Sequence, residues 1–440
     1  MNNKKWMAIL LGGIMAASLA APCSVSAAEK TTLTFWHAMG GTNGEVLQQI
    51  VDDFNASQDE IEVKAEYQGT YDDTITKLKA AMQSDSGLPD VCQMYDVGTK
   101  FMYDSGAVIP VEDKFESTGY DKSSVMEVIS SYYTVDGKQY SMPFNVSTPM
   151  LYYNKDVFEA AGLDPETPPT TYDEVLEDAK KIVESGAAPV GYSQAIYGWF
   201  FEQQLAGLGV TYGNNDNGRK EAVTAVDFDS NGGGLKVFDM WKKLYDSGCF
   251  EDYGTTTADT QTAFFSGQVG MIIESTAILK NAVDSSPFEV GTGYLPRIEQ
   301  NDEGGVIIGG GSLWLTDTGN EANEDAAWKF IEYITTPDVQ AKWSMGTGYF
   351  AINEKAYETE DMKAYLKENP NFETAINQLK DSPVNCNTAG VLSGVQTEAR
   401  LTFNEIMPQV YDGKLTTQDA VDQLAASVNK AIENYNESIK

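Results

Sequence analysis

Strand-like and helix-like runs alternate along most of this chain. Residues 33–36 have the pattern of a strand, residues 46–54 place apolar side chains at helical spacing, and residues 61–65 return to a strand pattern. The same order follows over residues 75–82 and 91–94. Such alternation predicts βαβ units, with a mostly parallel sheet and helices on both of its faces. The predicted fold class is α/β.

The two patterns continue through the second half of the chain. They predict strands at residues 150–153 and 269–273 and helices at residues 235–245 and 417–435. Thr170 or Thr171 can cap a further helix, which Gly186 would end. The polar loop at residues 214–218 is too short for an interdomain linker. Two lobes without a long linker imply that the chain crosses between them several times.

Charge excludes one large class of partners. The 440 residues include 65 acidic and 30 basic side chains, for a formal net charge of −35. A body with this excess of negative charge repels phosphate backbones, so no nucleic-acid partner is expected. The length fits two domains or one large two-lobed body.

The residues for most catalytic chemistry are missing from the sequence. His37 is the only histidine, and no G-x-S-x-G motif accompanies it. The cysteines lack C-x-x-C spacing, and residues 309–312 (Gly-Gly-Gly-Ser) lack the lysine of a phosphate loop. With 65 acids, chance carboxylate pairs are abundant and no spacing singles one out. We expect no enzyme, no metal site and no cofactor.

The first 27 residues have the features of an export signal. Lys4 and Lys5 precede the apolar residues 9–21, and residues 25–27 offer small side chains for cleavage. The apolar run is shorter than the ~20 residues that span a bilayer. Residues 1–27 are therefore predicted to be a signal peptide of a periplasmic or extracellular protein.

Cys23 leaves an alternative open. Residues 19–23 resemble a lipoprotein cleavage box, although Pro22 is atypical just before the cysteine. Lipidation there would anchor the chain to the outer face of the cell membrane.

Three arginines are the candidates for binding an anion. Arg219 lies in a polar loop and Arg297 follows Pro296, so both are expected to be solvated. Arg400 has a mixed apolar and polar setting. The residues alone favour an ion pair between Arg400 and one of the many acids. The alternative is a cleft guanidinium that holds a phosphate or carboxylate by two hydrogen bonds.

Aromatic residues beside glycines form the second candidate binding signal. They occur at residues 69–71, 197–199 and 348–349. Glycine lets a backbone approach a ligand, while the rings supply flat apolar faces that suit polyols and sugars. Each ring taken alone is more often part of a core.

Taken in order, several segments resemble one protein family. The motifs are similar to those of the sn-glycerol 3-phosphate-binding proteins of bacterial ABC importers, within the extracellular sugar-binding proteins. The matching segments are residues 35–39, 93–99, 143–149, 151–156, 161–166, 307–314 and 347–349. Tyr-Asn-Lys-Asp at residues 153–156 occurs across the wider family, so the ordered set is more specific than any single motif.

The resemblance implies a two-lobed, type II periplasmic-binding-protein fold with a ligand cleft between the lobes. It implies a first lobe of residues 29–145 plus 312–385 and a second lobe of residues 147–308 plus 390–440. The chain would cross between them near Asn145, near Gly310 and just before residue 390.

The resemblance also implies the ligand-binding residues. Arg400 matches the phosphate-binding arginine, and Asp96 stands where the family more often has glutamate. Trp199 would cover the ligand, and Ile196 replaces a second tryptophan, which weakens the case for glycerophosphocholine. The implied set is Tyr71, Asp96, Ser147, Trp199, Ser275, Gly310, Tyr349 and Arg400.

The implied function is capture without catalysis. The chain would be the substrate-binding component of an ABC importer, a monomer that captures sn-glycerol 3-phosphate or a glycerophosphodiester and delivers it to the transmembrane permease subunits. One alternative is a neutral oligosaccharide of the maltose type, with Arg400 in a structural role. A secreted carbohydrate-active hydrolase is a further alternative, which the absent acid/base signature disfavours.

Overall fold

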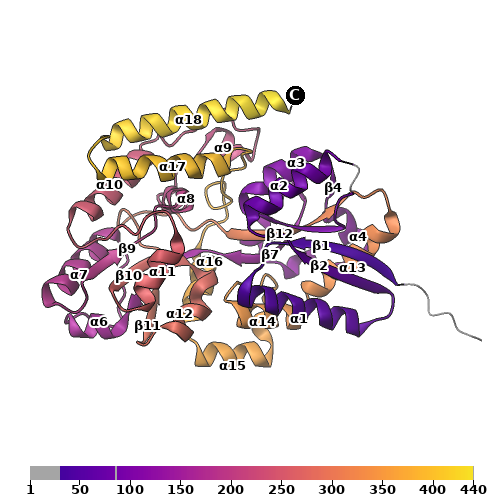
Figure 1. Cartoon of the computed structure of the whole chain (residues 1–440), viewed down its shortest axis with the longest axis horizontal. Helices are drawn as coiled ribbons and strands as arrows, with labels where there is room; N and C mark the ends of the chain where they lie inside the picture. Colours follow the sequence, from indigo (N-terminus) through magenta and orange to yellow (C-terminus); the bar gives the residue numbers. More distant parts are fainter. Residues whose placement is uncertain (1–29, 85–86, 440) are drawn as a thin grey trace, which may run out of the picture.

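Two mixed β-sheets organise the protein, each covered by helices (Figure 1). The computed structural model describes residues 30–84 and 87–439. The predicted signal peptide and Cys23 lie outside the described residues. We call the body around the six-stranded sheet the first lobe and the body around the four-stranded sheet the second lobe.

The six-stranded sheet has the order β2-β1-β3-β12-β4, with β7 paired to β12. Its strands are β1 (Thr31–His37), β2 (Ile61–Tyr67), β3 (Val91–Tyr95), β4 (Val108–Ile109), β7 (Met142–Ser147) and β12 (Gly309–Thr316). All residues of β3 and β7 are buried, as expected for a sheet covered on both faces. A small hairpin joins β5 (Thr134–Val135) to β6 (Lys138–Gln139).

The four-stranded sheet has the order β11-β8-β10-β9. Its strands are β8 (Pro149–Asn154), β9 (Val190–Ser193), β10 (Val269–Ser275) and β11 (Val290–Gly293). The predicted strands at residues 150–153 and 269–273 are therefore confirmed.

The prediction of a mostly parallel sheet is wrong. Strands β1–β2, β1–β3 and β9–β10 pair in parallel, but β12 is antiparallel to β3, β4 and β7, and β8 is antiparallel to β10 and β11. Both exceptional strands, β8 and β12, begin where the chain has just crossed between lobes. The crossing sets their direction, and a βαβ pattern read along the sequence does not register it.

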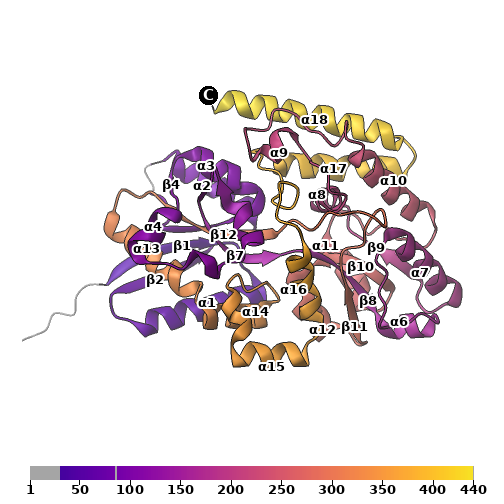
Figure 2. The same ribbon diagram turned by 180° about the vertical axis from the view of Figure 1, so that it is seen from behind.

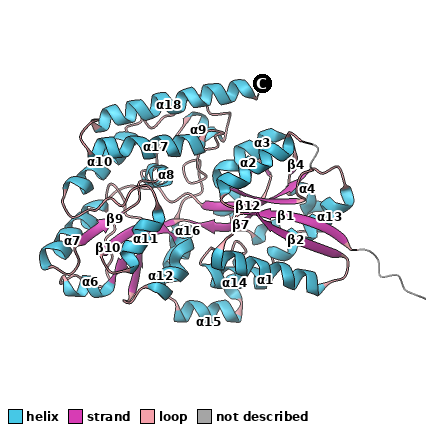
Figure 3. Ribbon diagram, in the orientation of Figure 1, coloured by secondary structure: helices cyan, strands magenta, loops and turns pink. Residues whose placement is uncertain are grey.

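Helices cover both faces of the first sheet (Figure 3). They are α1 (Gly41–Ser57), α2 (Tyr71–Met82), α3 (Thr99–Ser105), α4 (Glu112–Thr118), α5 (Glu127–Ser130), α13 (Glu321–Ile334) and α14 (Pro337–Thr347). Two further helices, α15 (Glu360–Glu368) and α16 (Asn371–Asp381), lie below the junction of the two lobes in Figure 1.

The second lobe carries the remaining helices. They are α6 (Lys155–Ala160), α7 (Tyr172–Ser185), α8 (Gly198–Gly207), α9 (Asn214–Gly218), α10 (Gly233–Asp246), α11 (Thr257–Phe265), α12 (Leu279–Ser285), α17 (Gln396–Tyr411) and α18 (Thr417–Ser438). Thr171 caps α7 in a capping box with Glu174, and Gly186 ends it at φ 74°, so both ends of this helix are as predicted. Figure 2 shows α17 and α18 side by side above α8 and α10.

Three segments connect the lobes. The chain passes directly from β7 to β8, returns between β11 and β12, and reaches the second lobe again at α16. Helix α16 packs on the second sheet, where Gln378 donates to the carbonyl of Pro149 at 2.7 Å and accepts from the Leu295 N–H at 2.5 Å. The predicted boundaries of the two lobes, including residue 385, stay predictions.

Candidate functional site

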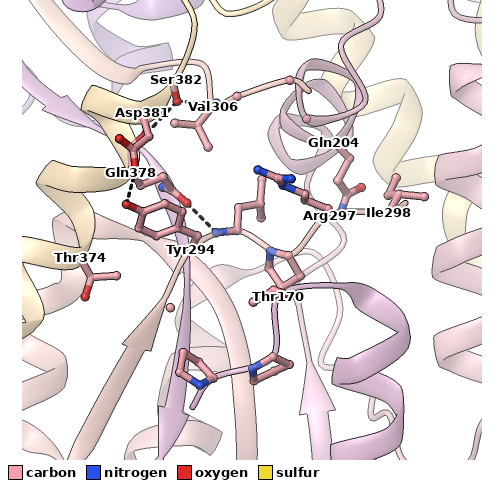
Figure 4. Close-up of a pocket in the computed structure, with 18 of the residues that line it drawn as sticks. Thr170, Gln204, Tyr294, Arg297, Ile298, Val306, Thr374, Gln378, Asp381 and Ser382 are labelled. Atoms are coloured by element: carbon pink, nitrogen blue, oxygen red, sulfur yellow. Dashed lines mark hydrogen bonds between the residues drawn. The ribbon is translucent and has the colours of Figure 1, made fainter. Parts of the chain in front are cut away.

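The cavity drawn in Figure 4 does not contain the predicted site. It has a volume of about 590 Å³ and lies between α16 and loops of the second lobe, with Arg297 and Tyr294 among its lining residues (Figure 4). Tyr294 donates to Asp381 at 2.8 Å there. None of the eight predicted ligand-binding residues lines this cavity. Asp96 and Arg400 of the predicted site lie instead at the junction of the lobes.

Arg400 lies at that junction and binds two carboxylates. Its Nε donates to Oε1 of Glu202 at 2.8 Å, and its Nη2 donates to Oε2 of Glu202 at 2.7 Å. The same Nη2 donates to Oδ2 of Asp96 at 2.9 Å. All three side chains are buried, with 6 to 8% of their surface exposed. Asp96 follows β3 of the first lobe, so the ion pair joins the two lobes.

Close packing of α8 against α17 places Glu202 beside Arg400. At Gly198, the first residue of α8, a Cβ would lie 2.5 Å from the Cα of Arg400, so only glycine permits this approach. Glu202 stands one helical turn further along α8. Gln396, one turn before Arg400 on α17, donates from Nε2 to Oε1 of Glu202 at 2.9 Å.

The charges of this group depend on one another. Burial raises the pKa of the Glu202 carboxyl, and attraction to Arg400 opposes that rise. Burial alone would lower the pKa of Arg400, but Asp96 and Glu202 outweigh it and hold that pKa well above its usual range. The guanidinium is therefore permanently charged and lies in contact with two carboxyl groups.

Neutral side chains form the opposite side of the junction. Asn145 donates from Nδ2 to the hydroxyl of Tyr71 at 2.6 Å and accepts at Oδ1 from Nε2 of Gln93 at 2.7 Å. Tyr71 stacks on Tyr95, with ring centroids 5.1 Å apart and planes at 7°. Tyr349 stacks on Trp343 at 5.6 Å. Burial raises the pKa of both Tyr71 and Tyr349, so their hydroxyls stay protonated.

The first two crossings lie next to this side. Gly310 has φ 93°, and a Cβ on it would lie 1.8 Å from the carbonyl oxygen of Asn145, so a side chain cannot be accommodated there. Ser147 pairs with Gly309 in the antiparallel register of β7 and β12. Ser275 ends β10, and its hydroxyl oxygen already accepts from the Ala277 N–H at 3.1 Å.

Trp199 carries a polar group that lacks a partner. The ring is 5% exposed and packs against Gly309, where a Cβ would lie 2.7 Å from the ring. Its Nε1 has no hydrogen-bond partner among the described residues, and Oε1 of Gln396 is also without one there. A buried group of this kind takes its partner from ordered water or from a ligand.

The structure thus brings the predicted residues to one junction, and their role in binding stays a prediction. Glu202 was not predicted, and neither were Asn145 or Gln396. A local signal for Glu202 did exist, because it follows Trp199 by three residues on the same helix face.

The expectation that Arg219 is solvated is wrong. The Arg219 side chain donates from Nε to the carbonyl of Gly390 at 3.0 Å, from Nη1 to that of Tyr132 at 2.8 Å, and from Nη2 to that of Ala389. The turn before it, residues 215–217, has positive φ at three successive non-glycine residues and directs the arginine inward. Arg297 is exposed, as expected.

Two features are absent from the part of the chain that the structure describes. None of its helices is long and apolar enough to cross a membrane. No group of three or more histidine, cysteine or acidic side chains gathers there in a way that could hold a metal ion.

Comparison with known proteins identifies the family. The sequence model for bacterial extracellular solute-binding proteins matches residues 49–374. The sn-glycerol-3-phosphate-binding periplasmic protein UgpB of Escherichia coli K12 is 31% identical over 417 residues, which cover 93% of this chain and 94% of that protein.

Solved structures share the fold. The cyclic alpha-maltosyl-1,6-maltose binding protein of Arthrobacter globiformis superposes with a TM-score of 0.77 at 26% identity, covering 92% of this chain and all of that one. UgpB of Mycobacterium tuberculosis, solved with glycerophosphocholine, gives a TM-score of 0.78 at 20% identity, covering 93% of this chain and all of that one. The chain therefore belongs to the family 1 extracellular solute-binding proteins, which are not enzymes but bind small solutes and deliver them to ABC permeases.

Proposed function

We propose that this solute-binding protein captures an uncharged polyhydroxylated ligand, a sugar or polyol, at the junction of its lobes. One observation carries the proposal: the Nε and Nη2 donors of Arg400 are bound by the carboxylates of Glu202 and Asp96. One positive and two negative charges leave the group with a net negative charge. A phosphate dianion added here would meet like charge in a poorly screened site.

The rest of the junction suits hydroxyl groups. Tyr71 and Tyr349 remain protonated there and present rings and hydroxyls. The free N–H of Trp199 can donate to a ligand hydroxyl, and Oε1 of Gln396 can accept from one. The relative from Arthrobacter globiformis binds a cyclic maltosyl-maltose, which is consistent with a sugar ligand.

A second candidate ligand is sn-glycerol 3-phosphate or a glycerophosphodiester. The 31% identity to UgpB of Escherichia coli favours it. The Nη1 of Arg400 also has no hydrogen bond within the described part of the chain, so part of the guanidinium can still reach a ligand. This candidate requires a phosphate to bind beside two carboxylates.

A thermal-shift panel separates the two candidates. The protein is heated with maltose, maltotriose, sn-glycerol 3-phosphate or glycerophosphocholine, against a buffer control. A ligand at about a hundred times its Kd adds about 2.7 kcal/mol to the free energy of unfolding, which raises Tm clearly. We expect a rise with a sugar and none with the phosphates. A rise with the phosphates alone would select the second candidate.

A further inference from the structure

Glu202 is a permanent partner of Arg400, whereas Asp96 is not. Glu202 and Arg400 both belong to the second lobe, on α8 and α17. Asp96 belongs to the first lobe. A movement that separates the lobes therefore removes Asp96 from the guanidinium and leaves Glu202 in place. The charge of Arg400 is compensated whether the lobes are together or apart.

The contact between Glu202 and Arg400 also has the geometry that a phosphate would need. The two carboxylate oxygens of Glu202 accept hydrogen bonds from Nε and Nη2 of Arg400 at 2.8 and 2.7 Å. This is the bidentate arrangement by which arginine binds carboxylates and phosphates. Gln396 holds Oε1 of Glu202 from a third direction at 2.9 Å. A phosphate cannot use this edge of the guanidinium without displacing Glu202.

We propose that Glu202 sets the charge of the ligand that the cleft accepts, by occupying the edge of Arg400 that would otherwise bind a phosphate. This inference rests on the proposed function, because it explains how a site with an arginine selects an uncharged ligand. Arg400 keeps Nη1 for a hydroxyl or ether oxygen. Glu202 is thus a specificity-determining residue, and the selection works through like-charge repulsion as well as occupancy.

The test is to remove the charge of Glu202 and measure phosphate binding. The dissociation constant for sn-glycerol 3-phosphate is measured by calorimetry for the wild-type protein and for Glu202→Gln. Glu202→Leu is made in parallel because it also removes every hydrogen-bond acceptor from the side chain. We expect both variants to bind sn-glycerol 3-phosphate about tenfold tighter than the wild-type protein or better. Maltotriose binding should change much less.

Glu274→Gln is the matched control. Glu274 is a second buried glutamate of the second lobe, but its carboxylate accepts from Gln261 at 2.9 Å and from the Ser275 N–H at 2.6 Å and has no contact with Arg400. Its substitution should leave the phosphate affinity at the wild-type value. The double variant Glu202→Gln/Arg400→Gln should lose the gain of the single variant, because the gain depends on the guanidinium.

The outcomes keep the two proposals apart. If Glu202→Gln and Glu202→Leu retain cooperative melting and bind sn-glycerol 3-phosphate no tighter than the wild-type protein, the role of Glu202 is refuted. An equal gain in phosphate affinity in Glu274→Gln would refute the role of Glu202 as well, since the loss of any buried acid would then raise the affinity. Tight binding of sn-glycerol 3-phosphate by the wild-type protein would instead contradict the proposal of an uncharged ligand. The ratio of the dissociation constants of variant and wild-type protein would still test the role of Glu202.

Discussion

The two sides of the junction stabilise their buried polar groups in different ways. The first-lobe wall, formed by Tyr71, Asn145, Gly310 and Tyr349, is neutral, although the first lobe also supplies Asp96 to the ion pair, and the amide and hydroxyl groups of the wall bond to one another. The second-lobe wall, formed by Trp199, Glu202, Gln396 and Arg400, is charged, and its groups are held by one bidentate ion pair.

The two walls should differ in how well they tolerate substitution. A neutral hydrogen bond contributes about 1 kcal/mol, and its loss leaves a modest penalty. A buried ion pair is stable only while both partners are present, because the survivor is an uncompensated charge. Removal of one charged residue from the second-lobe wall should therefore cause a large loss in the free energy of unfolding. Removal of one polar group from the first-lobe wall should cause a small one.

The largest effect is expected from Arg400→Gln. This change leaves Glu202 and Asp96 buried, close together and without their cation. We expect the free energy of unfolding to fall by about 3–5 kcal/mol, measured by urea denaturation at neutral pH. The double variant Glu202→Gln/Arg400→Gln should recover much of the loss. A loss below about 1 kcal/mol in the single variant would contradict the charged character of this wall.

Titration of His37 probes the first lobe separately. His37 ends β1 and is 6% exposed, and its Nδ1 accepts from the Met39 N–H at 3.3 Å. Burial lowers the pKa of His37 from 6.5 to about 4. Between these values the unfolded chain binds a proton and the folded protein does not. The contribution of His37 is thus present above pH 6.5 and is lost as the pH falls to about 4, up to about 3 kcal/mol.

The measurement uses His37→Gln as its reference. His37 is the only histidine in the chain, so the difference between the two proteins isolates one titration from those of the many carboxyl groups. Urea denaturation at several values between pH 7 and pH 4 should show a difference in unfolding free energy that changes over this window. Parallel pH profiles for the two proteins would show that His37 titrates alike in the folded and unfolded states.

A smaller effect is expected in the first-lobe wall from Tyr71→Phe. The change removes the acceptor of Asn145 Nδ2 but keeps the stack on Tyr95. We expect a loss of about 1–2 kcal/mol in the free energy of unfolding. Tyr103→Phe is the control, because its hydroxyl donates to Asp136 at an exposed position. If both variants lose the same amount, the first-lobe wall has no special role.

Local signals explain what the sequence could predict. Both ends of α7 follow from Thr171, Glu174 and Gly186, all within the helix or next to it. The strands and the long C-terminal helix follow from apolar spacing in the same way. Ordered motifs, rather than any one residue, pointed to the family that the comparisons then showed.

Contacts between distant residues explain what the sequence could not predict. Glu202 and Arg400 are 198 positions apart, and one acid among 65 cannot be assigned to one arginine without coordinates. Arg219 was expected in solvent because its neighbours are polar, but it donates to the carbonyls of Tyr132, Ala389 and Gly390, which are distant in the sequence. The directions of β8 and β12 depend on the lobe crossings in the same way.

The smallest effect is expected at a further contact between the two lobes. Tyr95 of the first lobe and Thr397 of α17 share a hydrogen bond at 2.6 Å between their hydroxyls, and Tyr95 also donates to Asp72 at 2.9 Å. Thr397→Val removes the contact between lobes and keeps the side-chain shape. A lost neutral hydrogen bond of about 0.5–1 kcal/mol should weaken the contact between the lobes and lower the affinity for a bound sugar about two- to fivefold.

Thr402→Val tells this effect apart from a general loss in α17. Thr402 lies on the same helix, and its hydroxyl donates only to the carbonyl of Glu398 at 2.9 Å, within that helix. Calorimetric titration with the sugar that stabilises the protein best should show weaker binding for Thr397→Val and an unchanged dissociation constant for Thr402→Val. Equal weakening in both would mean that the helix, and not the bond between the walls, carries the effect. Unchanged affinity in Thr397→Val would mean that the two walls are held together by the ion pair of Arg400 with Asp96, the stronger contact between the lobes.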